Sequence, residues 1–194
     1  MKNVWLNPKY AASGASHAVF ADRDGTLIEH VDYIDDPGKV ALLPGVKDAV
    51  QRLLSKNVPF FILTNQSGVG RGYFPIETVH ACQNRLFELL ETDPSDIAGW
   101  CIAPEVPGVE GGYRKPSPRF IQEACAHLGL SAGACHMIGD TMVDLETAWA
   151  AGAQAWAVGC GKPELPKQIA AGKIPGAHGL KADFNQCVKA ILSA

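Results

Sequence analysis

The chain has 194 residues, 47% of them hydrophobic and 19% charged, with a formal net charge of −3. This length suits one domain with a sizeable core, and we expect residues 1–194 to form a single domain. The slightly negative charge argues against nucleic acid as a partner. No apolar run is long enough to span a bilayer, so we expect no membrane partner either.

Residues 1–20 contain no long apolar segment like the core of a signal peptide. We therefore expect a cytoplasmic protein, and we expect it to be a monomer. The six cysteines are scattered without C-x-x-C spacing, which indicates reduced, mostly buried thiols rather than disulfides or a structural zinc.

Short apolar segments alternate with amphipathic segments along the chain. In chain order we predict a strand at 17–21, a helix at 44–57, a strand at 59–64, a helix at 76–91, a strand at 98–103, a helix at 117–129, a strand at 134–139, a helix at 142–152, a strand at 154–159 and a helix at 183–194. Ser117 and Pro118 suit the N-cap and first position of their helix, and Gly129 and Gly152 suit helix ends. This alternation predicts an α/β fold with a doubly wound, Rossmann-like parallel sheet.

Little sequence separates the first predicted strand from its helix, so we expect a minimal cap and an open site. The loop 104–116 is rich in glycine and proline and is a candidate for covering an active site. Specificity is then expected to come from the loops 29–40, 66–74 and 104–114.

Polar side chains follow four of the predicted strands. They are Asp22 and Asp24; Thr64, Asn65 and Gln66; Arg114 and Lys115; and Asp140 and Asp144. Because ligands of open parallel sheets bind beyond the carboxyl ends of the strands, we expect these residues to converge at one edge.

Such a site has the groups needed for phosphate chemistry. Crowded carboxylates repel one another, and a hard cation such as Mg²⁺ relieves this repulsion. Lys115 and Arg114 add positive charge that suits a phosphate-bearing ligand. One aspartate can attack phosphorus while another, two residues further on, exchanges protons. Gly25 allows the chain to turn sharply beside the phosphate.

Four motifs resemble those of the haloacid dehalogenase-type phosphatases, in the correct order and spacing. They are "DRDGT" (22–26), "TNQSG" (64–68), "RKPSP" (114–118) and "GDTMVD" (139–144). The stretches "LLPGV" (42–46) and "TNQSGVGRGYF" (64–74) are similar to one branch of that family. This branch contains the D-glycero-D-manno-heptose 1,7-bisphosphate phosphatases and the histidinol-phosphate phosphatases, and the resemblance extends over about residues 17–160.

The resemblance implies catalytic roles for the first two motifs. Asp22 is expected to be the nucleophile and a metal ligand. Asp24 is expected to be the general acid and base, and to bind the metal through its main-chain carbonyl. Thr64 and Asn65 are expected to bind the transferring phosphoryl group, whose charge Lys115 neutralises.

The later motifs imply a metal site and substrate contacts. Asp140 is expected to complete the Mg²⁺ site, with Asp144 as a further ligand or a support. Gln66 and Arg114 are expected to contact the substrate beyond the phosphoryl group. For Arg71 we consider a substrate contact and a simple flexible turn equally.

The relatives usually have a zinc loop before the third motif, and this chain departs from that pattern. The segment "CIAPEVPGVEGGYRKP" contains Cys101 as its single cysteine, and one thiolate cannot hold zinc. We therefore expect Mg²⁺ and no zinc. A second departure is Thr141, where relatives often have lysine.

The preferred hypothesis is a Mg²⁺-dependent phosphatase that forms an aspartyl phosphate and acts on a small phosphorylated sugar, preferably a heptose bisphosphate. Arg71, Arg114 and Lys39 are candidates for binding its second phosphate. Histidinol-phosphate hydrolysis and a phosphoacceptor signalling module are the alternatives, although Asp24 argues against a long-lived phosphoaspartate. "SGVGRG" does not complete a dinucleotide-binding motif, because Tyr73 stands where glycine is needed. We interpret the histidines as surface or packing residues.

Overall fold

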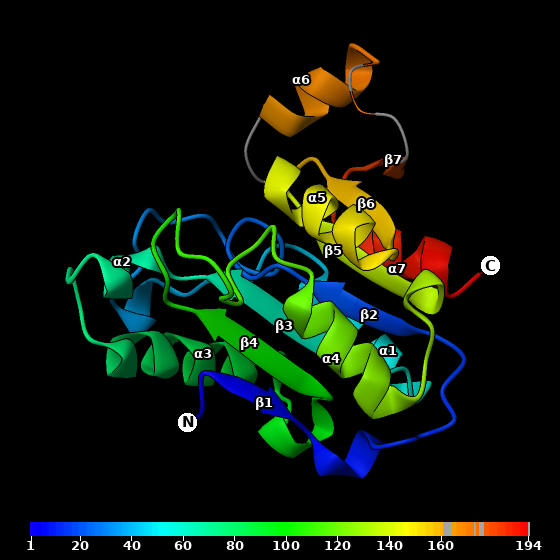
Figure 1. Cartoon of the computed structure of the whole chain (residues 1–194), viewed down its shortest axis with the longest axis horizontal. Helices are drawn as coiled ribbons and strands as arrows, with labels where there is room; N and C mark the ends of the chain where they lie inside the picture. The colour runs from blue at the N-terminus through cyan, green and yellow to red at the C-terminus, as the bar shows by residue number, and fades with distance from the viewer. Residues whose placement is uncertain (161–163, 173, 175–176, 194) are drawn as a thin grey trace.

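The computed structural model describes residues 1–160, 164–172, 174 and 177–193. A seven-stranded sheet with the order β1-β4-β3-β2-β5-β6-β7 forms its centre (Figure 1). The strands are β1 Val4–Leu6, β2 Ala18–Ala21, β3 Phe60–Asn65, β4 Gly99–Ala103, β5 Cys135–Gly139, β6 Gln154–Val158 and β7 Ala177–Lys181. Strands β2 to β7 pair in parallel, and β1 adds to β4 in the antiparallel direction. The predicted doubly wound sheet is therefore confirmed, with one antiparallel edge strand added.

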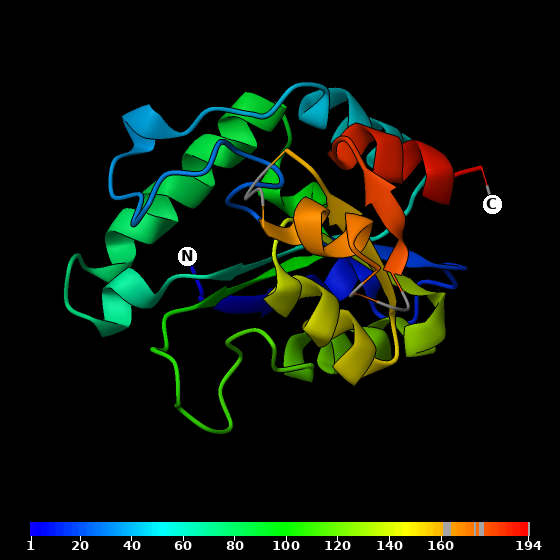
Figure 2. The same ribbon diagram turned by 90° about the horizontal axis from the view of Figure 1, so that it is seen from above.

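Helices cover both faces of this sheet. They are α1 Val46–Ser55, α2 Ser67–Gly70, α3 Ile76–Leu90, α4 Arg119–Leu128, α5 Met142–Ala151, α6 Glu164–Ala170 and α7 Phe184–Ile191, with short 3-10 helices η1 Pro8–Tyr10, η2 Pro37–Lys39, η3 Pro94–Asp96 and η4 Ala132–Ala134. Figure 2 shows α1, α3 and α7 on one face and α4 and α5 on the other. None of the helices described here has the length and apolar character required to cross a membrane.

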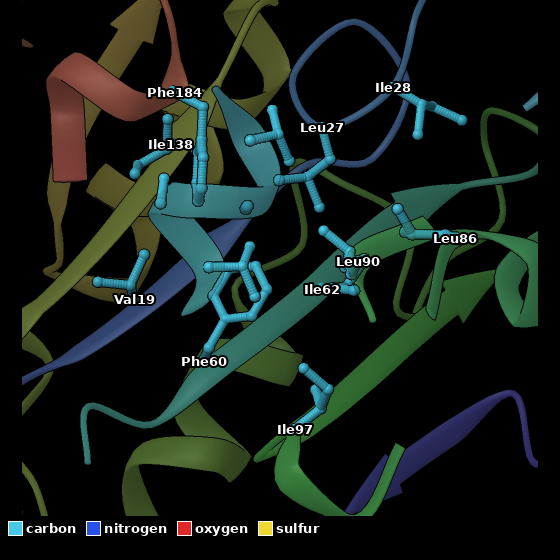
Figure 3. Packing of buried hydrophobic residues seen from close by; sticks show 14 of the residues in the cluster. Val19, Leu27, Ile28, Phe60, Ile62, Leu86, Leu90, Ile97, Ile138 and Phe184 are labelled. Atoms are coloured by element: carbon cyan, nitrogen blue, oxygen red, sulfur yellow. The ribbon is translucent and has the colours of Figure 1, made fainter. Parts of the chain in front are cut away.

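Successive side chains of a strand point to opposite faces of the sheet. Because helices cover both faces, the central strands are buried on each side. Val19 of β2 belongs to the core under α1, α3 and α7, which Figure 3 shows together with Phe60 and Ile62 of β3. Phe20 and Phe61, one position further along each strand, belong to the core under α4 and α5. The continuous apolar runs in the sequence follow from this double burial.

Strand register brings the ends of three strands to one edge of the sheet. Ala21, the last residue of β2, pairs with Ile62 of β3 and with Ile138 of β5. The segments from β2 to α1 and from β3 to α3 are fully described. The first contains η2 as its one helix, and the second contains α2. This agrees with the expected minimal cap and leaves the edge beyond β2 open.

The N-terminal segment forms a strand that the sequence pattern does not predict. Trp5 of β1 pairs with Trp100 of β4, and their ring centroids are 4.4 Å apart. The Trp100 indole also donates a hydrogen bond to the carbonyl of Lys2 at 2.8 Å. A segment of three residues is too short to show the alternation typical of a strand. Its pairing with β4 identifies it as a strand. The patterns also do not predict β7, α2 or α6.

The start of α4 differs from the prediction by two residues. Pro118, not Ser117, is the N-cap, and the helix begins at Arg119. The Ser117 hydroxyl donates to the carbonyl of Gly112 at 3.0 Å and accepts the amide hydrogen of Arg119 at 3.4 Å. The prediction of Ser117 as the N-cap was wrong by one position, because the helix begins at Arg119 and not at Pro118. The helix ends at Gly129 and Gly152, both with positive φ, agree with the prediction.

The Phe61→Ala substitution tests the packing under α4. Phe61 is fully buried, and its ring stacks on Phe20 at 4.6 Å and meets Phe120 edge-on at 6.0 Å. We expect the free energy of unfolding to fall by about 3–5 kcal/mol, as for other buried aromatic truncations. Urea denaturation followed by circular dichroism measures this change. Phe61→Leu, which keeps most of the volume, should cost less than about 1.5 kcal/mol, and equal losses for both variants would contradict the packing described.

Candidate active site

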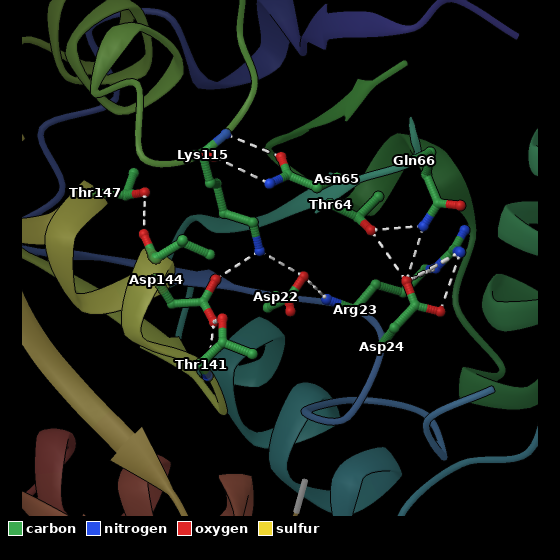
Figure 4. A network of polar contacts seen from close by, with 11 residues as sticks. Asp22, Arg23, Asp24, Thr64, Asn65, Gln66, Lys115, Thr141, Asp144 and Thr147 are labelled. Atoms are coloured by element: carbon green, nitrogen blue, oxygen red, sulfur yellow. Dashed lines mark hydrogen bonds and ion pairs between the residues drawn. The ribbon is translucent and has the colours of Figure 1, made fainter. Parts of the chain in front are cut away.

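Polar side chains from separate segments meet beyond the carboxyl ends of β2, β3 and β5 (Figure 4). Asp22 and Asp24 follow β2, Thr64 lies near the end of β3, and Asp140 follows β5. Lys115 enters from the loop between β4 and α4. Four of these side chains are nearly inaccessible to solvent, and Asp24 is partly exposed. The predicted residues therefore share one site, and burial makes their mutual contacts strong.

A tight turn after β2 presents the two aspartates. The carbonyl of Arg23 accepts hydrogen bonds from the amides of Leu27 and Ile28 at 2.9 and 3.0 Å. Gly25 has a φ of +87°, and a Cβ there would clash with the Asp140 carboxylate. Position 25 therefore requires glycine for its conformation and for the close approach of Asp140.

The ammonium of Lys115 lies between two carboxylates. Its Nζ is 2.7 Å from Asp22 Oδ1 and 2.5 Å from Asp144 Oδ1, and its side chain is 2% exposed. Burial opposes the charge on Lys115, but Asp144 and Asp22 raise its pKa above the usual value. Burial also raises the pKa of Asp22 well above its ordinary value; Lys115 opposes this shift, and the neighbouring carboxylates add to it.

Three carboxylates form a cluster that fits a cation. Oxygen atoms of Asp22, Asp140 and Asp144 all lie within 4.8 Å of one another. When all three are ionised, their negative charges repel one another, and a bound cation relieves this repulsion. Carboxylate oxygens are hard ligands of the kind that binds Mg²⁺. The donor set therefore fits Mg²⁺, and it brings Asp144 close to the predicted ligands Asp22 and Asp140.

The carboxylate of Asp24 has a different set of partners. It accepts hydrogen bonds from Arg23 Nε at 3.0 Å and Arg23 Nη2 at 3.2 Å. The Thr64 hydroxyl and the Gln66 amide donate to Asp24 Oδ2 at 3.0 and 2.9 Å. Figure 4 shows that this group lies on the opposite side of Asp22 from Asp144. The two aspartates of the first motif thus lie in distinct environments.

Asn65 fixes the main chain of Lys115. Its Oδ1 accepts the Lys115 amide hydrogen at 2.9 Å, and its Nδ2 donates to the Lys115 carbonyl at 3.1 Å. Both ends of the Asn65 side-chain amide are therefore used to position the lysine. The assignment of Asn65 to phosphate binding stays a prediction.

Asp144 combines a structural contact with a site contact. Its Oδ2 accepts hydrogen bonds from the amide and hydroxyl of Thr141, forming the capping box of α5. Its other oxygen, Oδ1, contacts Lys115. The helix cap and the lysine therefore share one carboxylate, and a role of Asp144 as a further metal ligand stays a prediction.

Two cavities adjoin these groups. One of about 170 Å³ is lined by Asp22, Asp24, His30, Thr64, Asn65, Lys115, Thr141 and Val143. The second, of about 240 Å³, lies between residues 30–34 and 65–68 and beside Asp24. His30 lines both cavities, which the sequence reasoning missed because a lone histidine carries no spacing signal. Its position in the predicted specificity loop 29–40 was the one available indication.

A second concentration of positive charge surrounds Arg114. Burial lowers the pKa of Arg114, and the charge of nearby Arg71 lowers it further, whereas Glu105 raises it. Two guanidinium groups close enough to influence each other's pKa suit an anionic ligand. Lys39, the other candidate, instead forms an exposed ion pair with Asp35 at 3.1 Å.

Comparisons with known proteins agree with this geometry. A family model for haloacid dehalogenase-like hydrolases matches residues 19–152. The D-glycero-beta-D-manno-heptose-1,7-bisphosphate 7-phosphatase of Mesorhizobium japonicum is 34% identical over 150 residues, covering 73% of this chain and 69% of that protein. The protein of the same name from Pseudomonas putida is 33% identical over 144 residues, covering 74% of this chain and 82% of that protein.

Solved structures show the same relationship. The D,D-heptose 1.7-bisphosphate phosphatase from B. bronchiseptica, complexed with magnesium and phosphate, gives a TM-score of 0.81 at 26% sequence identity. The alignment covers 91% of this chain and 98% of that structure. From the family match over most of its length, its curated relatives and its fold, we conclude that this chain belongs to the haloacid dehalogenase-like hydrolases.

Proposed function

We propose that this chain is a Mg²⁺-dependent phosphatase that removes one phosphate from D-glycero-D-manno-heptose 1,7-bisphosphate. The observation that carries the proposal is that Asp22 pairs with Lys115, clusters with Asp140 and Asp144, and lines a cavity of about 170 Å³. The names of the curated relatives support this substrate, since these relatives are 33–34% identical to this chain over about three quarters of its length.

Asp22 is the proposed nucleophile. Its Oδ1 accepts hydrogen bonds from the Lys115 ammonium and the Arg23 amide, both at 2.7 Å. We therefore assign the attack to Oδ2. Its attack forms an O–P bond while the P–O bond to the sugar breaks, which leaves an aspartyl phosphate. Lys115 balances the negative charge that gathers on the transferring group.

Asp24 is the proposed proton carrier. As a carboxylic acid it gives its proton to the departing sugar oxygen. As a carboxylate it then takes a proton from water, whose oxygen attacks phosphorus and releases inorganic phosphate from Asp22. The hydrogen bonds from Arg23, Thr64 and Gln66 hold the ionised form of Asp24 in place between these two steps.

Asp22, Asp140 and the main-chain carbonyl of Asp24 are the proposed metal ligands. When bound, Mg²⁺ supplies positive charge that offsets the carboxylates and polarises the phosphoryl oxygens. Thr64 lines the same cavity, and its hydroxyl is proposed to turn from Asp24 Oδ2 to a phosphoryl oxygen when the substrate binds. Asn65 keeps the lysine loop at the end of β3.

Arg114, Arg71 and Gln66 are proposed to contact the substrate beyond the reacting phosphate. Burial lowers the pKa of Arg114, and the charge of Arg71 lowers it further, which is consistent with two positive charges in one region. A second phosphate on the substrate matches this charge better than the neutral or cationic end of a monophosphate does. A bisphosphate is therefore favoured over histidinol phosphate, which carries an amine at that end.

Replacing the nucleophile should abolish turnover. We expect Asp22→Asn to lower kcat by at least about 10³-fold, because the amide cannot form the phosphoryl ester. Asp24→Asn should lower kcat by about 10²–10⁴-fold through loss of proton transfer. Phosphate release from the bisphosphate in Mg²⁺ measures both changes, and EDTA should remove the activity until Mg²⁺ is restored. The control is Asp48→Asn, which changes an exposed side chain of α1. Full turnover by Asp22→Asn would rule out the mechanism.

The substrate assignment makes a separate prediction. The wild-type kcat/KM should be higher for the heptose bisphosphate than for histidinol phosphate. Arg114→Ala should raise KM for the bisphosphate by about 10- to 100-fold, the range expected when a hydrogen bond between charged groups is lost. Steady-state kinetics of both substrates measures this, with the exposed Arg85→Ala as the matched arginine control. A higher kcat/KM for histidinol phosphate would contradict the assignment.

A further inference from the structure

Arg114 directly precedes Lys115 at the end of the segment 104–114, and Glu105 contacts both Arg114 and Tyr113. Glu105 Oε1 accepts the amide hydrogen of Tyr113 at 3.0 Å. The Glu105 carbonyl accepts a hydrogen bond from Arg114 Nη1 at 3.2 Å. Gly112 permits this approach, because a Cβ there would lie 2.6 Å from Glu105 Oε1. Glu105 therefore holds both the Arg114 guanidinium and the main-chain amide of Tyr113.

No metal ligand set exists in this segment, since residues 102–114 contain neither cysteine nor histidine. Side chains of α4 hold its far end instead. The Tyr113 hydroxyl donates to Glu123 Oε2 at 2.9 Å, and the Arg119 guanidinium lies 4.3 Å from the Tyr113 ring centroid. Arg119 also donates to the Gly111 carbonyl at 2.8 Å. The far end of the loop therefore has contacts with α4 in addition to the bond from the Tyr113 amide to Glu105.

Lys115 has independent anchors as well. Asn65 holds its main chain, and Asp22 and Asp144 hold its ammonium. These contacts come from β3, from the turn after β2 and from α5, and none of them passes through Glu105. A change at Glu105 should therefore reach Arg114 without displacing Lys115.

We infer that Glu105 is a positioning residue that orients Arg114 and so determines how strongly the enzyme recognises the non-reacting end of its substrate. The inference rests on the proposed function, in which Arg114 binds that end. Glu105 acts in two ways: its carbonyl fixes the guanidinium directly, and its carboxylate holds the adjacent main chain and opposes the repulsion between Arg114 and Arg71.

Steady-state kinetics with two substrates separates this role from a general structural role. The heptose bisphosphate has a distal phosphate, whereas p-nitrophenyl phosphate has none. We expect Glu105→Ala to raise KM for the bisphosphate about fivefold, a size typical of residues in direct contact, and to change kcat less than twofold. Its kcat/KM for p-nitrophenyl phosphate should stay within about twofold of wild type, because Lys115 and Asp22 are undisturbed.

Further variants keep the test independent of folding. Glu110→Ala removes an exposed carboxylate from the same loop and should leave both substrates unaffected. Glu105→Gln keeps an acceptor for the Tyr113 amide and should restore part of the lost affinity. Gly112→Ala, which displaces the Glu105 carboxylate, should raise KM for the bisphosphate as Glu105→Ala does. Glu105→Ala keeps the carbonyl that contacts Arg114 and removes only the carboxylate. The double variant Glu105→Ala/Arg114→Ala should be no worse than Arg114→Ala, because the carboxylate affects substrate binding only through Arg114.

The outcomes distinguish this inference from the proposed function. If Arg114→Ala raises KM and Glu105→Ala does not, the positioning role alone is overturned. Equal losses on both substrates for Glu105→Ala overturn it too, because they indicate general support of the loop. Additive losses in the double variant show that Glu105 does not act through Arg114. If Arg114→Ala itself changes neither substrate, the proposed distal contact fails, and the role of Glu105 fails with it.

Discussion

A single buried ammonium organises the site. Lys115 is held between Asp22 at 2.7 Å and Asp144 at 2.5 Å, almost without solvent contact. A buried charge is tolerated only when it is paired and hydrogen-bonded, so three distant segments must meet at this point. The strand β2, the helix α5 and the loop before α4 are fixed relative to one another through this ion pair. The position of the proposed nucleophile therefore depends on it.

The residues around the ion pair each stabilise the fold and shape the site. Asp144 caps α5 through Oδ2 and pairs with Lys115 through Oδ1. Asn65 ends β3 and fixes the main chain of Lys115. Gly25 lets the turn after β2 approach Asp140, which no other residue could allow. A site built in this way is rigid before any ligand arrives, which favours catalysis by fixed charges.

The residues proposed to face the substrate are held in place differently from the proposed catalytic residues. The catalytic groups sit at strand ends that the sheet register fixes, whereas Arg114 and Arg71 sit on loops whose shape depends on side-chain contacts. In segment 104–114 those contacts are a carboxylate, a tyrosine and an arginine that stacks on its ring. The proposed catalytic residues and the proposed substrate contacts are thus supported by separate parts of the fold.

The sequence alone determined the alternation of strands and helices, the order of the sheet-edge motifs and the expected meeting of Asp22, Asp140 and Lys115. These follow from hydrophobic periodicity and from the rule that parallel strands end at one edge, both of which are written locally in the chain. Only the tertiary structure decided that β1 joins β4, that Ser117 bonds Gly112 rather than capping α4, that His30 lines both cavities and that Glu105 holds Arg114. Each of these depends on which residues loop geometry and strand register bring within about 3 Å, the length of a hydrogen bond, and no local pattern encodes that distance.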